Sequence, residues 1–192
     1  MSIAHNMLQS GVRDLVYSDF AAAVEDVLGG GEVKLPYEEA GAVLDKYFQE
    51  LQEENAAKEA EIAAAMMKEG EEFLAENAKK DGVIVLPSGL QYKMLKEGND
   101  KMPSATSQVR CHYEGKFING QVFDSSYKRG EPAVFGLNQV IAGWTEGLQL
   151  MGEGGICELY IPYELAYVEM GSNGAIPPCA TLIFKVELLE VL

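Results

Sequence analysis

Cysteine and histidine are scarce in this chain of 192 residues, which contains three cysteines and two histidines. Cys111, Cys157 and Cys179 are odd in number and irregularly spaced. That pattern argues against a disulfide framework and favours a reducing compartment. Two histidines and no cluster of carboxylates leave little from which to build a metal site, so we expect no metal and no cofactor.

Positive charge is also in short supply, since 15 basic side chains face 30 acidic ones and the net charge is −15. Nucleic-acid binding needs a positive surface for phosphate contacts, so this balance argues against such a partner. The deficit is uneven. Residues 1–82 hold 7 basic and 18 acidic side chains, whereas residues 83–192 hold 8 and 12, which indicates two modules.

Long apolar runs are absent from the sequence, and none approaches the roughly 20 residues of a membrane span. The first residues, "MSIAHNMLQSGVRDL", lack the basic start and continuous apolar segment of a signal peptide. We therefore expect a cytoplasmic protein. A periplasmic or surface-associated location is the alternative if a signal peptide has been removed.

The first part of the chain has the spacing of helices. Apolar residues recur at helical intervals from Phe20 to Leu28, with Ser18 as the expected N-cap and Gly29 to Gly31 as the stop. A further short helix is expected over Ile3 to Leu15. Residues 37–79 contain no strong breaker and predict one helix of roughly 65 Å, since each residue adds about 1.5 Å.

That long helix changes character midway. Apolar residues form a stripe from Ala40 to Leu51, but no large apolar residue occurs from Gln52 to Glu61. A few short helices make a thin core by themselves, because domains below about 60 residues bury little surface. A homodimer that buries the stripes against a second copy is the favoured interpretation. A three-helix cap within one chain is the alternative.

The periodicity changes to two after Gly82. Alternating apolar and polar residues in "QVRCHYEGKF", "CELYI" and "ATLIFKVELL" indicate antiparallel strands with one face on a core. One short helix is expected where Ile141, Trp144 and Leu148 recur. The predicted class is α+β: residues 1–82 form an all-α dimerisation region with a long stalk helix, and residues 83–192 form an antiparallel sheet packed on one short helix.

The second module lacks a recognisable nucleophile for covalent catalysis but is rich in aromatic residues. No Ser, Cys or Lys lies in a recognisable nucleophile setting, and strand alternation turns His112 away from the core face. Six aromatic residues and one neighbouring acid, Asp124, are the candidates for a binding pocket: Tyr113, Phe123, Phe135, Trp144, Tyr167 and Phe184.

Several motifs in the same order resemble one family. "HYEGKFINGQVFDSS", "VIAGWTEGLQLM", "IPYELAY" and "IPPCATLIFKVELL" are similar to the FKBP-type peptidyl-prolyl cis-trans isomerases, from about Leu86 to the C-terminus. The upstream helices and "GEEFLAENAKKDGV" resemble the bacterial subgroup related to macrophage infectivity potentiator, whose members are V-shaped homodimers. The resemblance implies an FKBP-like fold and an isomerase that acts on proline-containing peptides and unfolded protein clients.

The resemblance also implies a role for each pocket residue. Trp144 would form the floor under the proline ring, and Asp124 would polarise the site. The Ile141 backbone N–H and the Tyr167 hydroxyl would hydrogen-bond the substrate or a macrolide inhibitor of the FKBP class, and Ile176 would cap the pocket. The walls would be formed by Tyr113, Phe123, Phe135, Val140, Ile141 and Phe184.

Two positions depart from the family pattern. The family has glycine after Ala-Tyr, where this chain has Val168, and Gly136 removes a side chain at the expected pocket rim. We expect Val168 to be extended, because β-branched residues suit that conformation. The departure leaves an alternative function open: a dimeric folding chaperone or proline-segment binding module with weak or no turnover. A scaffold acting through the acidic stalk is a third interpretation.

Overall fold

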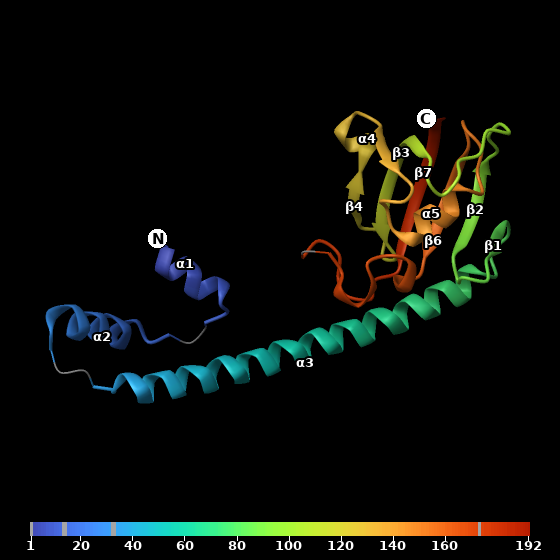
Figure 1. The fold of residues 1–192 in the computed structure, drawn as a ribbon. Helices are drawn as coiled ribbons and strands as arrows, with labels where there is room; N and C mark the ends of the chain where they lie inside the picture. The colour runs from blue at the N-terminus through green and yellow to red at the C-terminus, as the bar shows by residue number, and fades with distance from the viewer. Residues whose placement is uncertain (1, 13–14, 32–33, 173) are drawn as a thin grey trace. The chain divides into compact units, whose positions relative to one another are not determined.

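The computed structural model describes residues 2–12, 15–31, 34–172 and 174–192. The chain divides into two compact units, Met1–Lys58 and Glu59–Leu192, and the long helix α3 (Tyr37–Asn77) contributes to both (Figure 1). This division lies within α3, whereas the sequence suggested modules that meet at residue 82.

The first unit consists of α1 (Ser2–Gln9), α2 (Tyr17–Gly29) and the beginning of α3. Helix α2 begins at Tyr17 with Val16 as its N-cap and no side-chain capping bond, so the expected cap at Ser18 is wrong. Gly30, at φ 68°, ends the helix in the left-handed conformation that glycine adopts without strain. Helix α1 ends earlier than Leu15, and residues 13–14 of that segment lie outside the described residues.

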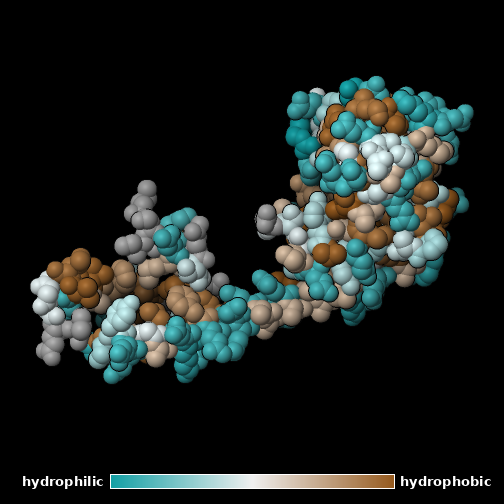
Figure 2. Space-filling model, viewed as in Figure 1, coloured by the Kyte–Doolittle hydropathy of each residue, from teal (hydrophilic) through white to brown (hydrophobic). Residues whose placement is uncertain are grey.

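Apolar side chains of this first unit remain exposed. Helix α2 has no buried residue, and Figure 2 shows apolar side chains gathered over α2 and the start of α3. Val27 and Leu28 are 65% and 82% exposed, and Val43 and Leu44 on α3 are also exposed. The unit therefore has apolar surface that its own short helices do not cover.

Helix α3 confirms the single long helix predicted over residues 37–79. Glu38 and Glu39 lie in its first turn, where carboxylates complement the positive helix end. Its middle is exposed and carries ion pairs four residues apart, Lys46–Glu50 at 3.6 Å and Lys58–Glu54 at 2.6 Å. Such pairs add about 0.2–0.5 kcal/mol each to a solvated helix.

The second unit is a seven-stranded antiparallel sheet with short helices, as the α+β prediction required. The strands run in the spatial order β1-β2-β6-β7-β3-β4, with β5 paired to β3. Their bounds are β1 Val83–Val85, β2 Gln91–Lys96, β3 Gln108–Phe117, β4 Val122–Ser125, β5 Ala133–Gly136, β6 Ile156–Ile161 and β7 Leu182–Val191. The helical segments are α4 Ser126–Arg129, α5 Ala142–Leu148, η1 Tyr163–Leu165 and η2 Val168–Met170.

Helix α5 lies across one face of the sheet and brings Trp144 into the core (Figure 1). Two glycines permit this close packing. A Cβ on Gly143 would lie 2.5 Å from Cγ2 of Ile161, and one on Gly147 would lie 2.7 Å from Cδ2 of Leu159. Both partners belong to β6, so any larger residue would push α5 and its tryptophan off the sheet.

The last turns of α3 pack against the sheet. Asn77 is fully buried and its Nδ2 donates to Oε1 of Gln91 at 3.0 Å, while Gln91 Nε2 donates to the Leu74 carbonyl at 2.9 Å. Gly70 lies directly against the Thr181 side chain, where an added Cβ would clash. These contacts explain why residues from Glu59 onward belong to the unit that contains the sheet.

Candidate active site

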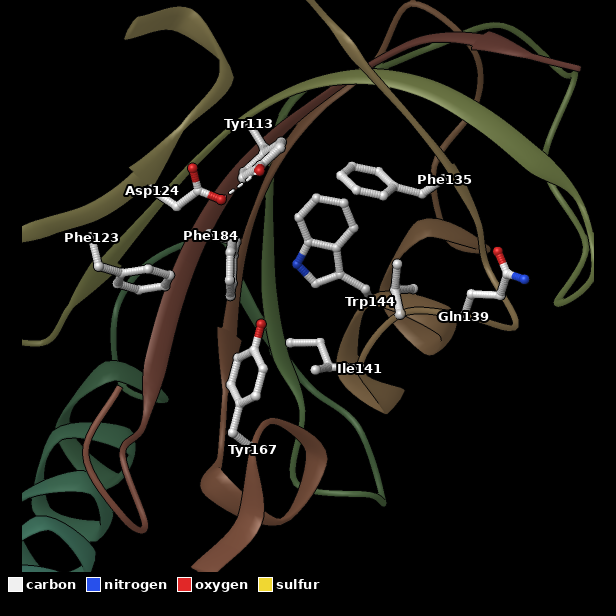
Figure 3. Close-up of a pocket in the computed structure, with 10 residues that line it drawn as sticks. Tyr113, Phe123, Asp124, Phe135, Gln139, Ile141, Trp144, Tyr167 and Phe184 are labelled. Atoms are coloured by element: carbon white, nitrogen blue, oxygen red, sulfur yellow. Dashed lines mark hydrogen bonds between the residues drawn. The ribbon is translucent and has the colours of Figure 1, made fainter. Parts of the chain in front are cut away.

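A cavity of about 520 Å³ opens on the face of the sheet that carries α5 (Figure 3). Its walls come from five strands or helices and two loops that are far apart in the sequence. Nine of the ten residues predicted for the site line it, together with Gln139, which the sequence did not single out: Tyr113, Phe123, Asp124, Phe135, Gln139, Val140, Ile141, Trp144, Tyr167 and Phe184.

Trp144 forms the centre of the aromatic wall and is only 4% exposed. Its indole is nearly perpendicular to three surrounding rings, at centroid distances of 5.3 Å to Tyr113, 5.5 Å to Phe135 and 5.3 Å to Phe184. Edge-to-face packing of this kind is favourable for aromatic rings and holds them in fixed orientations. The cavity therefore has a closely packed aromatic floor.

Asp124 is the carboxylate of the cavity, and two side chains hold it. The Tyr113 hydroxyl donates to Asp124 Oδ2 at 2.5 Å, as Figure 3 shows, and Arg129 pairs with Oδ1. Arg129 also donates to the Tyr113 hydroxyl oxygen at 2.8 Å. Partial burial by itself raises the pKa of Asp124, but the bonds from Tyr113 and Arg129 outweigh it and lower the pKa below its ordinary value.

Arg129 and the helix that presents it were missed by the sequence interpretation, which expected one short helix after Gly82. Helix α4 is a second one, only four residues long, and its side-chain cap is Ser125. The signal that could have indicated it is "SSYKRG", a serine cap followed by basic residues and glycine. This helix places the guanidinium of Arg129 five residues after Asp124, where it pairs with the carboxylate.

Tyr167 reaches the cavity from the turn between η1 and η2. Burial, followed by the charge of Asp124, raises the pKa of its hydroxyl, so the phenol remains a hydrogen-bond donor at neutral pH. The next residue contradicts the expectation of an extended Val168, because its φ is 50°. Cys179 has a φ of 55°, and its N–H donates to the Val168 carbonyl at 3.0 Å. The Tyr167 loop is thus held by two non-glycine residues in a conformation that disfavours side chains.

Ile176 does not line the cavity, although the sequence interpretation made it a cap. It is 6% exposed and packs in the hydrophobic core, and its carbonyl accepts the Ser172 N–H at 2.9 Å. Gly136 is the last residue of β5 and follows Phe135 of the cavity wall. A Cβ there would approach Asn138 Oδ1 to 2.9 Å and Gln139 Oε1 to 3.3 Å, so glycine leaves room for the Gln139 side chain at the edge of the cavity.

The cysteines and His112 lie outside the cavity wall. Cys111 and Cys157 are buried, and burial raises the pKa of each thiol to about 12, which suppresses the reactive thiolate at neutral pH. His112 contacts Ser126 and stacks on Tyr127. Among the described residues, no group of three or more His, Cys, Asp or Glu side chains is placed to hold a metal ion. The cavity offers shape, apolar surface and oriented hydroxyl groups.

Comparisons with known proteins agree with this architecture. The family model described as FKBP-type peptidyl-prolyl cis-trans isomerase matches residues 99–189, and one described as the domain amino-terminal to that isomerase matches residues 1–94. The chain is 43% identical to the FKBP-type 22 kDa peptidyl-prolyl cis-trans isomerase of Escherichia coli, over 100% of this chain and 91% of that protein. It therefore belongs to the family of FKBP-type peptidyl-prolyl cis-trans isomerases, and the predicted family, fold class and enzymatic activity are confirmed.

Two further relatives cover nearly the whole chain. The crystal structure of FkpA from Escherichia coli matches with a TM-score of 0.77 and 37% identity, over 97% of this chain and 86% of that one. The outer membrane protein MIP of Legionella longbeachae is 38% identical over 98% of this chain and 81% of that protein. This second name gives no support to the cytoplasmic location expected from the sequence. No described helix is both long and apolar enough to cross a membrane.

Proposed function

We propose that X-Pro bonds rotate within the aromatic cavity, without any covalent intermediate. The observation that carries this proposal is the combination of a closely packed aromatic floor around Trp144 with one carboxylate held by Tyr113 and Arg129 at the wall. The cavity also has the size of small-ligand pockets, which measure about 300–1,000 Å³. A proline ring with its flanking peptide groups fits such a volume.

The physics of the reaction explains why apolar walls suffice. Rotation must cross about 18–20 kcal/mol because amide resonance is lost in the twisted state. No bond between heavy atoms forms or breaks. The planar amide is more polar than the twisted one, so a dry aromatic site disfavours the ground state relative to the transition state. That difference in binding accelerates the rotation.

The site residues predicted from the sequence then have the following roles. Trp144 supports the proline ring, and Phe135, Val140, Phe123 and Phe184 enclose it. The Ile141 N–H and the Tyr167 hydroxyl bind the substrate carbonyl groups on either side. Asp124 and Tyr113 present a fixed dipole to the rotating carbonyl. Ile176 packs in the core and supports the loop that follows Tyr167 through its bond to Ser172. Macrolide inhibitors of the FKBP class would occupy the same cavity and use the same two hydrogen bonds.

The Tyr167 hydroxyl provides a direct test. In a protease-coupled assay on an Ala-Ala-X-Pro-Phe peptide, Tyr167→Phe should lower kcat/KM about threefold to tenfold, because one net hydrogen bond contributes roughly 0.5–1.5 kcal/mol. Tyr163→Phe removes a hydroxyl from η1, four residues earlier and outside the cavity wall, and should leave kcat/KM unchanged. Equal activity of the wild type and Tyr167→Phe would contradict the assigned role.

We also propose that the protein is a homodimer that acts on unfolded clients in a bacterial cell. The uncovered apolar surface of α2 and early α3 supports the dimer, and the bacterial origin of the relatives above supports the source. Chaperone activity with weak turnover is the second candidate, favoured by the strained φ of Val168 beside Tyr167. Binding of unfolded protein without acceleration of peptide isomerisation would establish that alternative.

A further inference from the structure

Ser126, the first residue of α4, is completely buried behind the cavity wall. Its hydroxyl accepts the Tyr113 backbone N–H at 2.8 Å and lies 3.3 Å from the Tyr113 carbonyl oxygen. It also lies 2.9 Å from Nδ1 of His112. A hydroxyl has one donor and two acceptor positions, so these three contacts saturate it when His112 Nδ1–H donates to Oγ and Oγ–H donates to Tyr113.

The other end of α4 holds the same tyrosine. Arg129, the last residue of the helix, donates to the Tyr113 hydroxyl and pairs with Asp124. Tyr113 is therefore gripped at its backbone by the first residue of α4 and at its phenol by the last. Displacement of Ser126 would move both the tyrosine and the arginine relative to Asp124.

The third partner of Ser126 is itself fixed. The His112 ring stacks on Tyr127 at 4.6 Å with an angle of 15° between the planes, and the Tyr127 hydroxyl donates to Glu187 at 2.9 Å. Glu187 lies opposite His112 in the register of β3 and β7. Two hydrogen bonds and one ring stack thus connect Glu187, through Tyr127 and His112, to Ser126 and the cavity wall.

We propose that Ser126 is a positioning residue for the isomerase reaction. It acts through the Tyr113 backbone and through α4 to set the geometry of Tyr113, Asp124 and Arg129, and His112 orients its hydroxyl. The inference rests on the proposed role of the cavity. Misplacement of a positioned group costs catalysis heavily because little of the reacting geometry can be recovered. The neighbouring Ser125 is also buried, but its hydroxyl bonds the Lys128 N–H at 3.4 Å instead of the Tyr113 backbone, which makes Ser125→Ala a matched control.

The experiment compares full-length Ser126→Ala and Ser125→Ala in the peptide assay, with urea unfolding for stability. Ser126→Ala should lower kcat/KM by at least about fivefold, since a buried donor and acceptor lose their partner, while Ser125→Ala should change it less than twofold. The protein has one tryptophan, and Trp144 packs edge-on against Tyr113, so its emission reports the tyrosine position. The emission should change in Ser126→Ala and stay constant in Ser125→Ala. Equal effects of the two variants on rate and emission would overturn the proposal.

Two further measurements remain decisive if Ser126→Ala folds poorly. His112→Phe keeps a ring against Tyr127 but removes the bond to Ser126, and it should lower kcat/KM about twofold to fivefold. In a double-mutant cycle, His112→Phe should have little additional effect once Arg129→Ala has already released Tyr113. Wild-type rate for His112→Phe, or full additivity in the cycle, would refute the positioning role. Either result would leave the cavity proposal intact, because Tyr167→Phe tests that separately.

Discussion

Val168 shows how one residue can be misjudged from its neighbours. Tyr163, Leu165 and Ala166 suit an extended chain, and a β-branched residue after them suggested the same. The structure instead gives Val168 a φ of 50° and couples it by a backbone hydrogen bond to Cys179, whose φ is 55°. The contact is long-range: the Cys179 N–H bonds the Val168 carbonyl, and the local preference of valine yields to it.

The strain predicts a gain from glycine at this position. The left-handed conformation costs a non-glycine residue about 1–2 kcal/mol, and glycine loses about 0.5–1 kcal/mol through unfolded-state entropy. Val168 is 47% exposed, so little packing is lost. Val168→Gly should raise the urea midpoint and increase kcat/KM up to about fivefold. Val134→Gly, an equally exposed valine in extended strand β5, should lower the midpoint; a loss in both variants would show that Val168 is unstrained.

The ionisation of Asp124 sets the expected pH dependence of peptide isomerisation. Its pKa is lowered by Tyr113 and Arg129, so the ionised form persists as pH falls below the ordinary carboxyl value of about 3.9. Peptide isomerisation, followed by NMR exchange in the absence of protease, should therefore remain constant from pH 7 to about pH 4. The pKa of Tyr113 is raised by its burial and by Asp124, so the phenol keeps its proton above its ordinary range.

Arg129→Leu tests that assignment. Without the guanidinium the pKa of Asp124 rises, and the loss of activity on acidification should begin at a higher pH than in the wild type. Lys128→Leu removes the same charge from the same helix, and the structure gives Lys128 no bond to Asp124. Its pH profile should match the wild type. Identical pH profiles for both variants would show that Arg129 does not lower the pKa of Asp124.

Among the elements, α3 has two different roles along its length. Its middle is a solvated helix held by pairs such as Lys58–Glu54, whereas its last turns bury Asn77 and pack Gly70 on Thr181. The ring centroids of Phe73 and of Tyr160 on β6 lie 6.2 Å apart, and the Lys80 ammonium lies over the Phe73 ring at 5.5 Å from its centroid. The helix end is thus part of the fold that carries the cavity.

Because the end of α3 packs on the sheet, the expected active fragment begins earlier than residue 83. The sequence placed the activity in residues 83–192, but we expect residues 59–192 to match the full chain on short peptides. Residues 83–192 should isomerise them with a clearly lower unfolding midpoint, because Gln91 loses its buried partner and Tyr160 is uncovered. Urea unfolding with the peptide assay decides this. Equal midpoints for the two fragments would show that the helix end contributes nothing.

For the whole molecule, the apolar surface of the first unit is the decisive feature. Phe20 and Val24 on α2 and Phe48 on α3 are about two-fifths exposed, an unusual amount of uncovered apolar area for a small helical unit. A second copy with the same surface would bury it symmetrically. Two cavities joined in one particle would also raise the effective concentration of active sites around a bound client.

Removal of residues 1–52 should therefore give a monomer in sedimentation analysis, with the isomerase unit folded. The monomer should match the full chain on short peptides but accelerate proline-limited refolding of a protein less well, because its sites are no longer linked. Phe20→Glu should weaken the dimer, whereas Glu25→Gln on the same helix should not. A monomeric full-length protein at micromolar concentration would contradict the dimer proposal.

Much of this protein was determined by local pattern in the sequence. A helical periodicity predicted α3, and a periodicity of two residues predicted the antiparallel strands, because burial of one face repeats at a fixed interval along each element. The aromatic residues and Asp124 were identifiable as a site because their motifs occur in order. Other features depended on contacts between distant segments. Arg129 of α4 bonds Tyr113 of β3, Ser126 bonds His112, and the Cys179 N–H bonds the carbonyl of Val168, whose φ is positive. No local preference encodes such contacts, since they exist only after the sheet has brought those segments together.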